Sequence, residues 1–207
     1  MKLLNILAIF FCLLCAQTTA AAATPAETLA DKLKPLVTSA GEFEQIATDG
    51  TGEVVQESSG TFAVQQPGKF LWHTIEPFEQ LLVSDGETIW LHDPDLEQVT
   101  VKPFNDNQNQ LPIRILSGEF ELLDSEFTIE TSESKQTVRF HLTPREASNI
   151  QSIDLVFSDD DLQSMSVTDH ADTQTQFRFA NRRALNDDDI QAFDFQIPEG
   201  ADVFHDQ

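Results

Sequence analysis

Cysteine is nearly absent from the sequence: there are only two, Cys12 and Cys15. Both belong to an apolar stretch that follows Lys2 and is too short to form a membrane-spanning helix. A short basic start, an apolar run and then small residues are typical of a secretory signal peptide, which we expect at residues 1–20, with cleavage possible as late as residue 23. The mature domain, residues 21–207, would then contain no thiol, which excludes a disulfide framework and cysteine chemistry.

Positive charge is also scarce. Lys and Arg total 12 against 35 Asp and Glu, so the formal net charge is −23, and loss of Lys2 with the leader makes it more negative. A surface that binds phosphates needs clustered Lys and Arg, so nucleic acid is not an expected partner. Two interpretations of the charge remain open: it keeps the chain soluble, or it repels the chain from anionic membrane surfaces.

Motifs for catalysis or metal binding are missing. The sequence has no GxSxG elbow and no phosphate-binding P-loop, and no two of its five His are spaced i, i+4. The acidic runs at residues 159–161 and 187–189 lack the EF-hand pattern and are interpreted as solvated turns. No carboxylate pair stands out as it would in a glycosidase. We therefore expect no catalytic residue, no metal and no cofactor, and strong like-charge repulsion favours a monomer.

Tyrosine is absent, whereas the sequence has 16 Phe and two Trp. Tyr normally serves where a buried ring also needs a polar tip. A surface made of rings without such tips suits either an ordinary packed core or a hydrocarbon ligand. Composition alone favours the ordinary core.

A helix is predicted at the start of the mature chain. Thr24 can cap it, Pro25 fits its first position and Glu27 can reach back to the cap. Apolar residues follow at helical spacing, and Pro35 should kink or shorten the helix.

From residue 42 onward the apolar pattern has a period of two, which indicates about ten or eleven short strands separated by Gly and Pro turns. The last expected strand contains Phe193, Phe195 and Ile197. A polar segment at residues 104–110 and a short helix ending at Gly118 interrupt the strands. No βαβ rhythm occurs, so a parallel sheet is not expected. The prediction is a mainly β (α+β) fold, a curved antiparallel sheet that curls into an incomplete barrel with helices at its mouth; a barrel filled with its own side chains is the alternative.

One series of motifs is more specific. Residues 64–72 (VQQPGKFLW) lead into Glu76-Pro77, then residues 81–86 (LLVSDG) and residues 89–91 (IWL). Residues 43–45 (FEQ) and 193–195 (FDF) add to the series. In order and spacing these motifs resemble the LolA family of outer-membrane lipoprotein carrier proteins, over nearly the whole mature chain.

The resemblance implies an incomplete barrel of about eleven strands with a helical lid over an apolar cavity. It implies a non-enzymatic periplasmic carrier, in a Gram-negative bacterium, that binds acylated lipoproteins. The family receives them from an inner-membrane ABC exporter and delivers them to the outer-membrane receptor LolB. LolB carries a lipidated cysteine, but Cys15 follows Leu14 rather than a small residue, which favours the soluble carrier. A lipocalin-like binder of free lipids or other small hydrophobic molecules is the rival interpretation.

Site residues are expected in three groups. We expect the lipid-binding cavity to be lined by Phe43, Phe62, Phe70, Trp72, Leu82, Ile89, Leu91, Val99 and Val101. The lid is expected to contribute Leu33, Leu36, Ile113 and Leu116. Gln66 stands where the family often has an Arg that latches the lid, so the latch should be weaker here, unless Lys69 or Arg114 supplies the charge.

Overall fold

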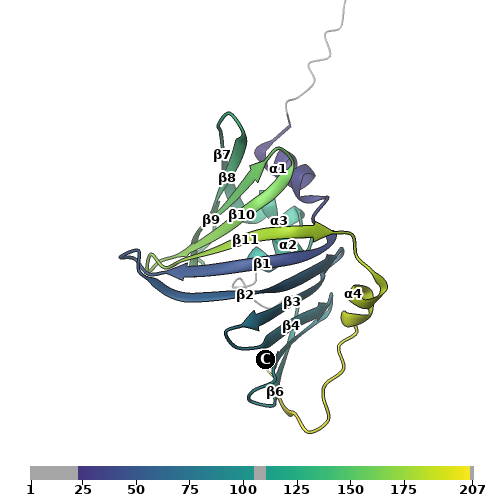
Figure 1. The fold of residues 1–207 in the computed structure, drawn as a ribbon. Helices are drawn as coiled ribbons and strands as arrows, with labels where there is room; N and C mark the ends of the chain where they lie inside the picture. Colours follow the sequence, from purple (N-terminus) through teal and green to yellow (C-terminus); the bar gives the residue numbers. More distant parts are fainter. Residues whose placement is uncertain (1–22, 105–110, 206–207) are drawn as a thin grey trace, which may run out of the picture.

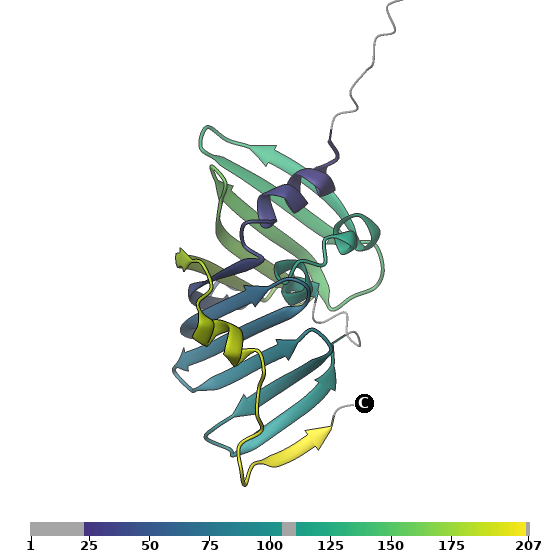
Figure 2. The same cartoon turned by 90° about the vertical axis from the view of Figure 1, so that its right-hand side faces the viewer.

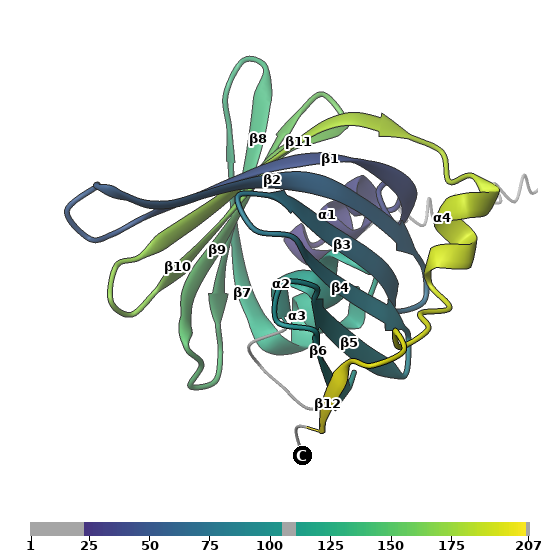
Figure 3. The ribbon, with the colours of Figure 1, turned by 60° about the horizontal axis from the view of Figure 1, so that its bottom comes forward.

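The computed structural model describes residues 23–104 and 111–205. One twelve-stranded sheet curls around three helices, and a fourth helix lies outside it (Figures 1 and 3). The helices are α1 (Pro25–Leu33), α2 (Leu111–Leu116), α3 (Glu121–Glu126) and α4 (Asp187–Ala192). The strands are β1 (Thr38–Thr48), β2 (Val54–Gln65), β3 (Lys69–Glu76), β4 (Gln80–Asp85), β5 (Thr88–Asp93), β6 (Gln98–Pro103), β7 (Phe127–Glu133), β8 (Thr137–Pro144), β9 (Ile150–Ser158), β10 (Asp161–Asp169), β11 (Gln174–Arg183) and β12 (Asp202–His205).

The strand order is β12-β6-β5-β4-β3-β2-β1-β11-β10-β9-β8-β7, so β7 and β12 are the two edges of an open sheet. This confirms the predicted curved, incomplete barrel. All neighbours are antiparallel except β12, which pairs in parallel with β6. The expected strand at residues 193–197 is wrong: Phe193 ends α4, and an extended segment then leads to β12 (Figure 2).

The predicted start of α1 is confirmed. The Glu27 backbone N–H donates to Thr24 Oγ1 (3.2 Å), and the Thr24 N–H donates to Glu27 Oε2 (2.8 Å), which satisfies two otherwise unpaired helical donors. The helix ends at Leu33, just before Pro35, as expected of a residue that cannot continue it. Leu29 and Leu33 are fully buried against the sheet.

Alternation gives the sheet two distinct faces. Residues that pair directly across antiparallel strands share a face, and the register of β2 to β5 defines one row on each. The inner row is Phe62, Trp72, Leu82 and Leu91. The outer row is Ala63, Leu71, Val83 and Trp90.

The C-terminal segment covers part of the outer face. Phe193 is buried against Ala40 and Ala63, and the Phe195 ring lies 6.0 Å from that of Trp90. This cover explains why β3 is apolar on both faces.

Residues 187–189 were expected to form a solvated turn, but they form the first turn of α4. The N-cap is Asn186, whose side chain accepts from the Asp189 N–H (2.9 Å). Asp189 also pairs with Arg183 (2.5 Å). Carboxylates are favoured at a helix N-terminus because unpaired N–H groups point there.

On the outer face of β8 and β9, Asp154 is nearly buried between two partners. Its Oδ1 accepts from Arg139 Nε (2.8 Å) and lies 2.8 Å from His141 Nδ1. Burial by itself would raise the pKa of Asp154, but the hydrogen bonds with Arg139 and His141 outweigh it and lower that pKa.

Candidate ligand-binding face

An aromatic cluster occupies the middle of the inner face. The Trp72 ring stacks on Phe43 with a centroid distance of 3.9 Å, and Phe62 lies 6.2 Å from it. Phe177 and Phe179 meet Trp72 edge-on, at 5.4 and 6.4 Å. These rings come from β1, β2, β3 and β11, and the four Phe carry no polar group. The surface they form is suited to apolar packing and to hydrocarbon.

Helix α2 closes over this surface. Leu116 is buried with Leu36, Phe62 and Val64 in the main core. Beneath α2 remains a cavity of only about 20 Å³, whose lining is apolar apart from Ser117. A single water molecule needs about 10–15 Å³ on the same measure. An acyl chain therefore cannot occupy this end of the inner face while α2 stays in place.

Gln66 reaches the end of α2. Its side-chain Nε2 donates to the Gly118 carbonyl oxygen (3.3 Å), and the Gly68 N–H donates to the Ser117 carbonyl (3.4 Å). Gly118 has φ +98°, and a Cβ there would lie 3.1 Å from the Gln66 side chain, so glycine allows this close approach. The placement suits the predicted latch, whose role stays a prediction.

In the described ranges, the side chains of the two cations considered as substitutes for the latch form no hydrogen bond with the end of α2, and their role stays a prediction. Arg114 pairs with Glu119, at 2.5 Å between Nη2 and Oε2. Lys69 forms no ion pair with any residue in the described ranges.

The structure places most of the predicted cavity residues on the inner face. They are Phe43, Phe62, Phe70, Trp72, Leu82, Ile89 and Leu91. Their role in lipid binding stays a prediction.

Val99 and Val101 lie on the opposite face, which corrects the expectation for these two residues. Val99 pairs with His92 and Val101 with Trp90, and the rings of His92 and Trp90 pack against Phe195 outside the sheet. A period of two shows which residues share a face but not which face is inside.

Three of the four predicted lid residues lie in the main core, and the fourth cannot be placed. Leu33, Leu36 and Leu116 are buried in the same core. The side chain of Ile113 lies outside the described part of the structure. Ile115 is fully buried, so α2 contributes two adjacent residues, Ile115 and Leu116.

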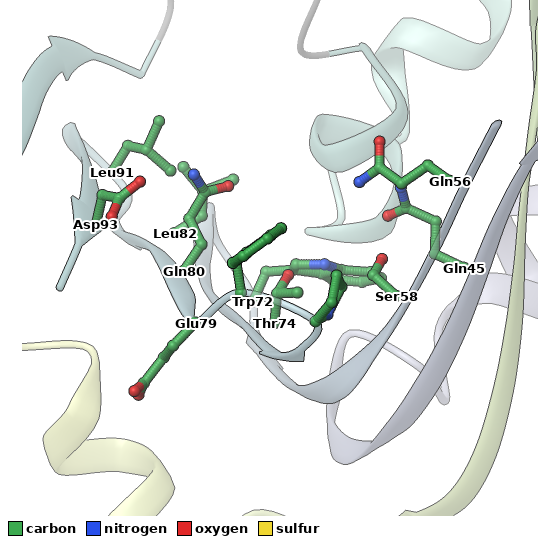
Figure 4. A pocket seen from close by; sticks show the side chains of 12 residues that line it. Gln45, Gln56, Ser58, Trp72, Thr74, Glu79, Gln80, Leu82, Leu91 and Asp93 are labelled. Atoms are coloured by element: carbon green, nitrogen blue, oxygen red, sulfur yellow. The ribbon is translucent and has the colours of Figure 1, made fainter. Parts of the chain in front are cut away.

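Several residues of this face were not predicted from the sequence. Phe177 and Phe179 showed the right alternation but were not assigned to the site. A groove of about 570 Å³ was missed entirely; it continues the inner face away from α2, toward the β3–β4 turn (Figure 4). It is lined by Gln45, Gln56, Ser58, Trp72, Thr74, Pro77, Phe78, Glu79, Gln80, Leu82, Leu91 and Asp93. Most of these are polar, so a search for apolar periodicity could not find them.

Neither a metal-binding cluster nor a membrane-spanning helix is present in the described ranges. Residues 23–104 and 111–205 contain no group of three or more His, Cys, Asp or Glu that could hold a metal ion. None of their helices is both long and apolar enough to cross a membrane.

A curled open sheet with an apolar inner face, closed by helices, defines an incomplete β-barrel. The family description "Outer membrane lipoprotein carrier protein LolA" matches residues 35–196. A protein named outer-membrane lipoprotein carrier protein from Hahella chejuensis is 34% identical over 98% of both chains, and one from Azotobacter vinelandii is 39% identical over 78% of both. This chain therefore belongs to the LolA family. The fold also resembles that of an uncharacterized conserved protein from Thermus thermophilus (TM-score 0.52, 12% identity, 88% of this chain and all of the other).

Proposed function

We propose that this protein is a periplasmic carrier that binds the acyl chains of lipoproteins released from the inner membrane and delivers them to an outer-membrane receptor. The observation that carries the proposal is the aromatic inner face, closed by one short helix over a cavity with no room for a ligand. The relatives named as lipoprotein carriers support it.

The energetics of acyl burial limit what such a carrier does. Burial contributes about 0.8 kcal/mol per CH₂, so three long chains amount to roughly 30 kcal/mol or more. Non-covalent affinities saturate near about 20 kcal/mol. The carrier therefore shields the chains only in part. The chain has no ATP-binding loop and so cannot use ATP to release its ligand. Partial shielding keeps the affinity moderate, which allows release without ATP.

Transfer then depends on differences in affinity. An inner-membrane ABC exporter would supply the energy for extraction, and the outer-membrane receptor LolB would bind the acyl chains more tightly than this carrier does. Handover to LolB would run downhill without further energy.

Helix α2 must move for the acyl chains to bind. Its described contacts with the sheet are the buried side chains of Ile115 and Leu116 and the hydrogen bonds that Gln66 and Gly68 donate at its end. A hydrogen bond contributes only about 1 kcal/mol net, so the closed state is held mainly by apolar contact. Acyl chains offer the sheet the same kind of contact and can replace the helix.

A release assay tests the proposal. Spheroplasts carrying newly made, radiolabelled lipoproteins are incubated with the purified mature protein, and the supernatant is examined. We expect lipoproteins in the supernatant in a complex with the protein, and none with an unrelated acidic secreted protein. Lipoproteins that stay on the membrane in the presence of the folded protein would contradict the carrier role, and copurification of free lipids alone would favour the lipocalin-like alternative.

A further inference from the structure

The groove beside the aromatic cluster contains hydrogen-bonding groups that the protein itself does not use. Among the described residues, the side chains of Gln45, Gln56, Ser58, Thr74 and Gln80 form no hydrogen bond with another protein group. Ser58 is only 8% exposed, so its hydroxyl is unpaired in a nearly buried position. Buried polar groups normally have a partner. The Ser58 hydroxyl therefore indicates a ligand with complementary polar groups, and the more exposed side chains of the other four residues are available to the same ligand.

The chemistry of the lining restricts that ligand. Amides and hydroxyls both donate and accept hydrogen bonds, which matches ester and amide groups. Among the described residues, no Lys or Arg lines the groove, whereas Asp93 does; Glu79 lies at its edge, with its carboxylate turned to His73 (2.9 Å) on the outer face. A phosphate would lack a cationic partner and would meet the carboxylate of Asp93. The groove is thus suited to an uncharged polar ligand and unsuited to an anionic headgroup.

The groove is continuous with the apolar surface. Trp72 and Leu82 line the groove on the same inner face that carries the aromatic cluster. Figure 4 shows Gln45 and Gln56 together on one side, with Leu82, Leu91 and Asp93 on the other and Trp72 between. Along β3, Thr74 in the groove and Phe70 near α2 are four residues apart, or about 13 Å of extended strand. A ligand with a polar end in the groove could therefore lay its hydrocarbon along the strand toward α2.

We propose that this groove binds the uncharged polar linkage of a lipoprotein, namely the glyceryl esters and the first amide groups that join the acyl chains to the polypeptide. This inference rests on the proposed carrier function and adds a basis for selectivity. Acyl chains bind the apolar face whatever they are attached to, and the groove distinguishes a lipopeptide from an anionic phospholipid with the same chains.

Two probes with equal hydrocarbon test the inference. One is an S-dipalmitoylglyceryl-cysteinyl-serine peptide with both ends blocked; the other is dipalmitoyl phosphatidylglycerol. The affinity of each probe is measured by its displacement of a fluorescent fatty acid from the mature protein. Palmitate, measured in the same way, reports binding to the apolar face alone. We expect the wild-type protein to bind the lipopeptide more tightly than the phospholipid.

The double variant Gln45→Leu, Gln56→Leu should bind the lipopeptide about tenfold more weakly, as expected for two lost hydrogen bonds, while palmitate binds no more weakly. Gln174→Leu, the same change at an exposed outer position of β11, should bind both like the wild type. Gln56→Lys adds a cation at an exposed position and should bind the phospholipid at least threefold more tightly than the wild type does.

The results separate this inference from the carrier function. If palmitate and the lipopeptide both fail to bind the wild-type protein, the carrier function itself is wrong. If both bind the wild-type protein, two results would overturn the inference: the double variant keeps its affinity for the lipopeptide, or it loses affinity for palmitate equally. Either result would mean that the groove does not recognise the ester and amide groups of the linkage. An unchanged phospholipid affinity in Gln56→Lys would also overturn the inference.

Discussion

The two halves of the inner face are built differently. Helices α1 and α3 pack on β7 and β10, and between these strands β8 and β9 carry Phe140, Leu142, Ile153, Leu155 and Phe157, all fully buried; we call this part the scaffold half (Figure 2). The inner face of β2 to β5, beneath α2 and next to the groove, is the exchange half. There Leu82 and Leu91 remain partly exposed. A small hydrophobic core, separate from the main one, has only Phe70, Ile89 and Phe104 as buried residues.

This difference shows how one sheet can be both stable and open to a ligand. The scaffold half is covered by helices that also contact one another, so its core closes without a ligand. The exchange half is covered by the six residues of α2. Isolated helices that short are not stable in water. The apolar surface beneath α2 can thus change its cover while the scaffold half stays folded.

Of the changes considered, a disulfide that locks α2 onto the sheet should have the largest effect on lipoprotein uptake. A Cβ at Gly118 would lie 3.4 Å from the Gln66 Cβ, close to the roughly 3.5–4.5 Å of a disulfide, and the mature domain would contain no competing cysteine. Oxidised Gln66→Cys, Gly118→Cys protein should therefore lose lipoprotein uptake in the release assay. Reduction should restore it.

The reduced form of the same protein is the control, because it carries both substitutions, including the strain of a non-glycine residue at φ +98°. Normal uptake by the oxidised protein would mean that acyl chains bind without displacement of α2.

Core truncations should distinguish the halves by stability. Phe140→Ala removes a fully buried ring that packs edge-on against Phe157, 5.8 Å away, and should lower the free energy of unfolding by about 3–5 kcal/mol. Phe70→Ala should cost less, because the small core around it can collapse, and should impair lipoprotein uptake more than stability. Urea denaturation and the release assay measure the two effects. Equal losses of stability in both variants would remove the distinction between the halves.

Asp154, on the outer face of β8 and β9, should contribute to the stability of the scaffold half but not to ligand uptake. Its pKa is lower in the folded protein than the unfolded value of about 3.9, so its ionised form stabilises the fold above that pH, and this contribution is lost as the pH falls through the folded pKa. Asp154→Asn should cost about 1–3 kcal/mol at pH 7, and the difference from the wild type should shrink below about pH 4. Uptake at pH 7 by the folded fraction should be unchanged. A constant difference across this pH range would mean that the charge of Asp154 is not what stabilises the fold.

The scaffold half was the more predictable from sequence. Rows such as Ile153, Leu155 and Phe157 occupy every second position of one strand, so their shared face follows from the strand period alone. The start of α1 was predictable because its capping groups are local. In both cases the interactions that decide the structure lie within a few residues of one another.

The exchange half and the C-terminal segment were less predictable because distant residues decide them. Val99 and Val101 alternate like inner residues, but Phe195 covers the outer face beside them. The four residues of β12 form a strand only because β6 offers a free edge. The groove depends on polar side chains that β1, β2 and β3 bring together, and no local pattern marks them.

The smallest effect is expected at the latch, where Gln66→Arg should favour the closed exchange half. Gln66 donates one hydrogen bond to Gly118, at the C-terminal end of α2, where carbonyl groups lack helical partners. A guanidinium would donate charge-assisted bonds to the same carbonyls and would be favoured by the partial negative charge there, a gain of about 0.3–1 kcal/mol. The empty variant should therefore bind a fluorescent hydrophobic probe about two- to fivefold more weakly than the wild type.

Gln66→Met is the matched control, because it keeps the length of the side chain but removes the donor. It should bind the probe slightly more tightly than the wild type, so the order of affinity should be Met, Gln and then Arg. All three proteins should unfold at similar urea concentrations, since the scaffold half is untouched. If Arg, Gln and Met give the same probe affinity, residue 66 does not act as a latch, and the apolar contacts of Ile115 and Leu116 alone hold α2 on the sheet.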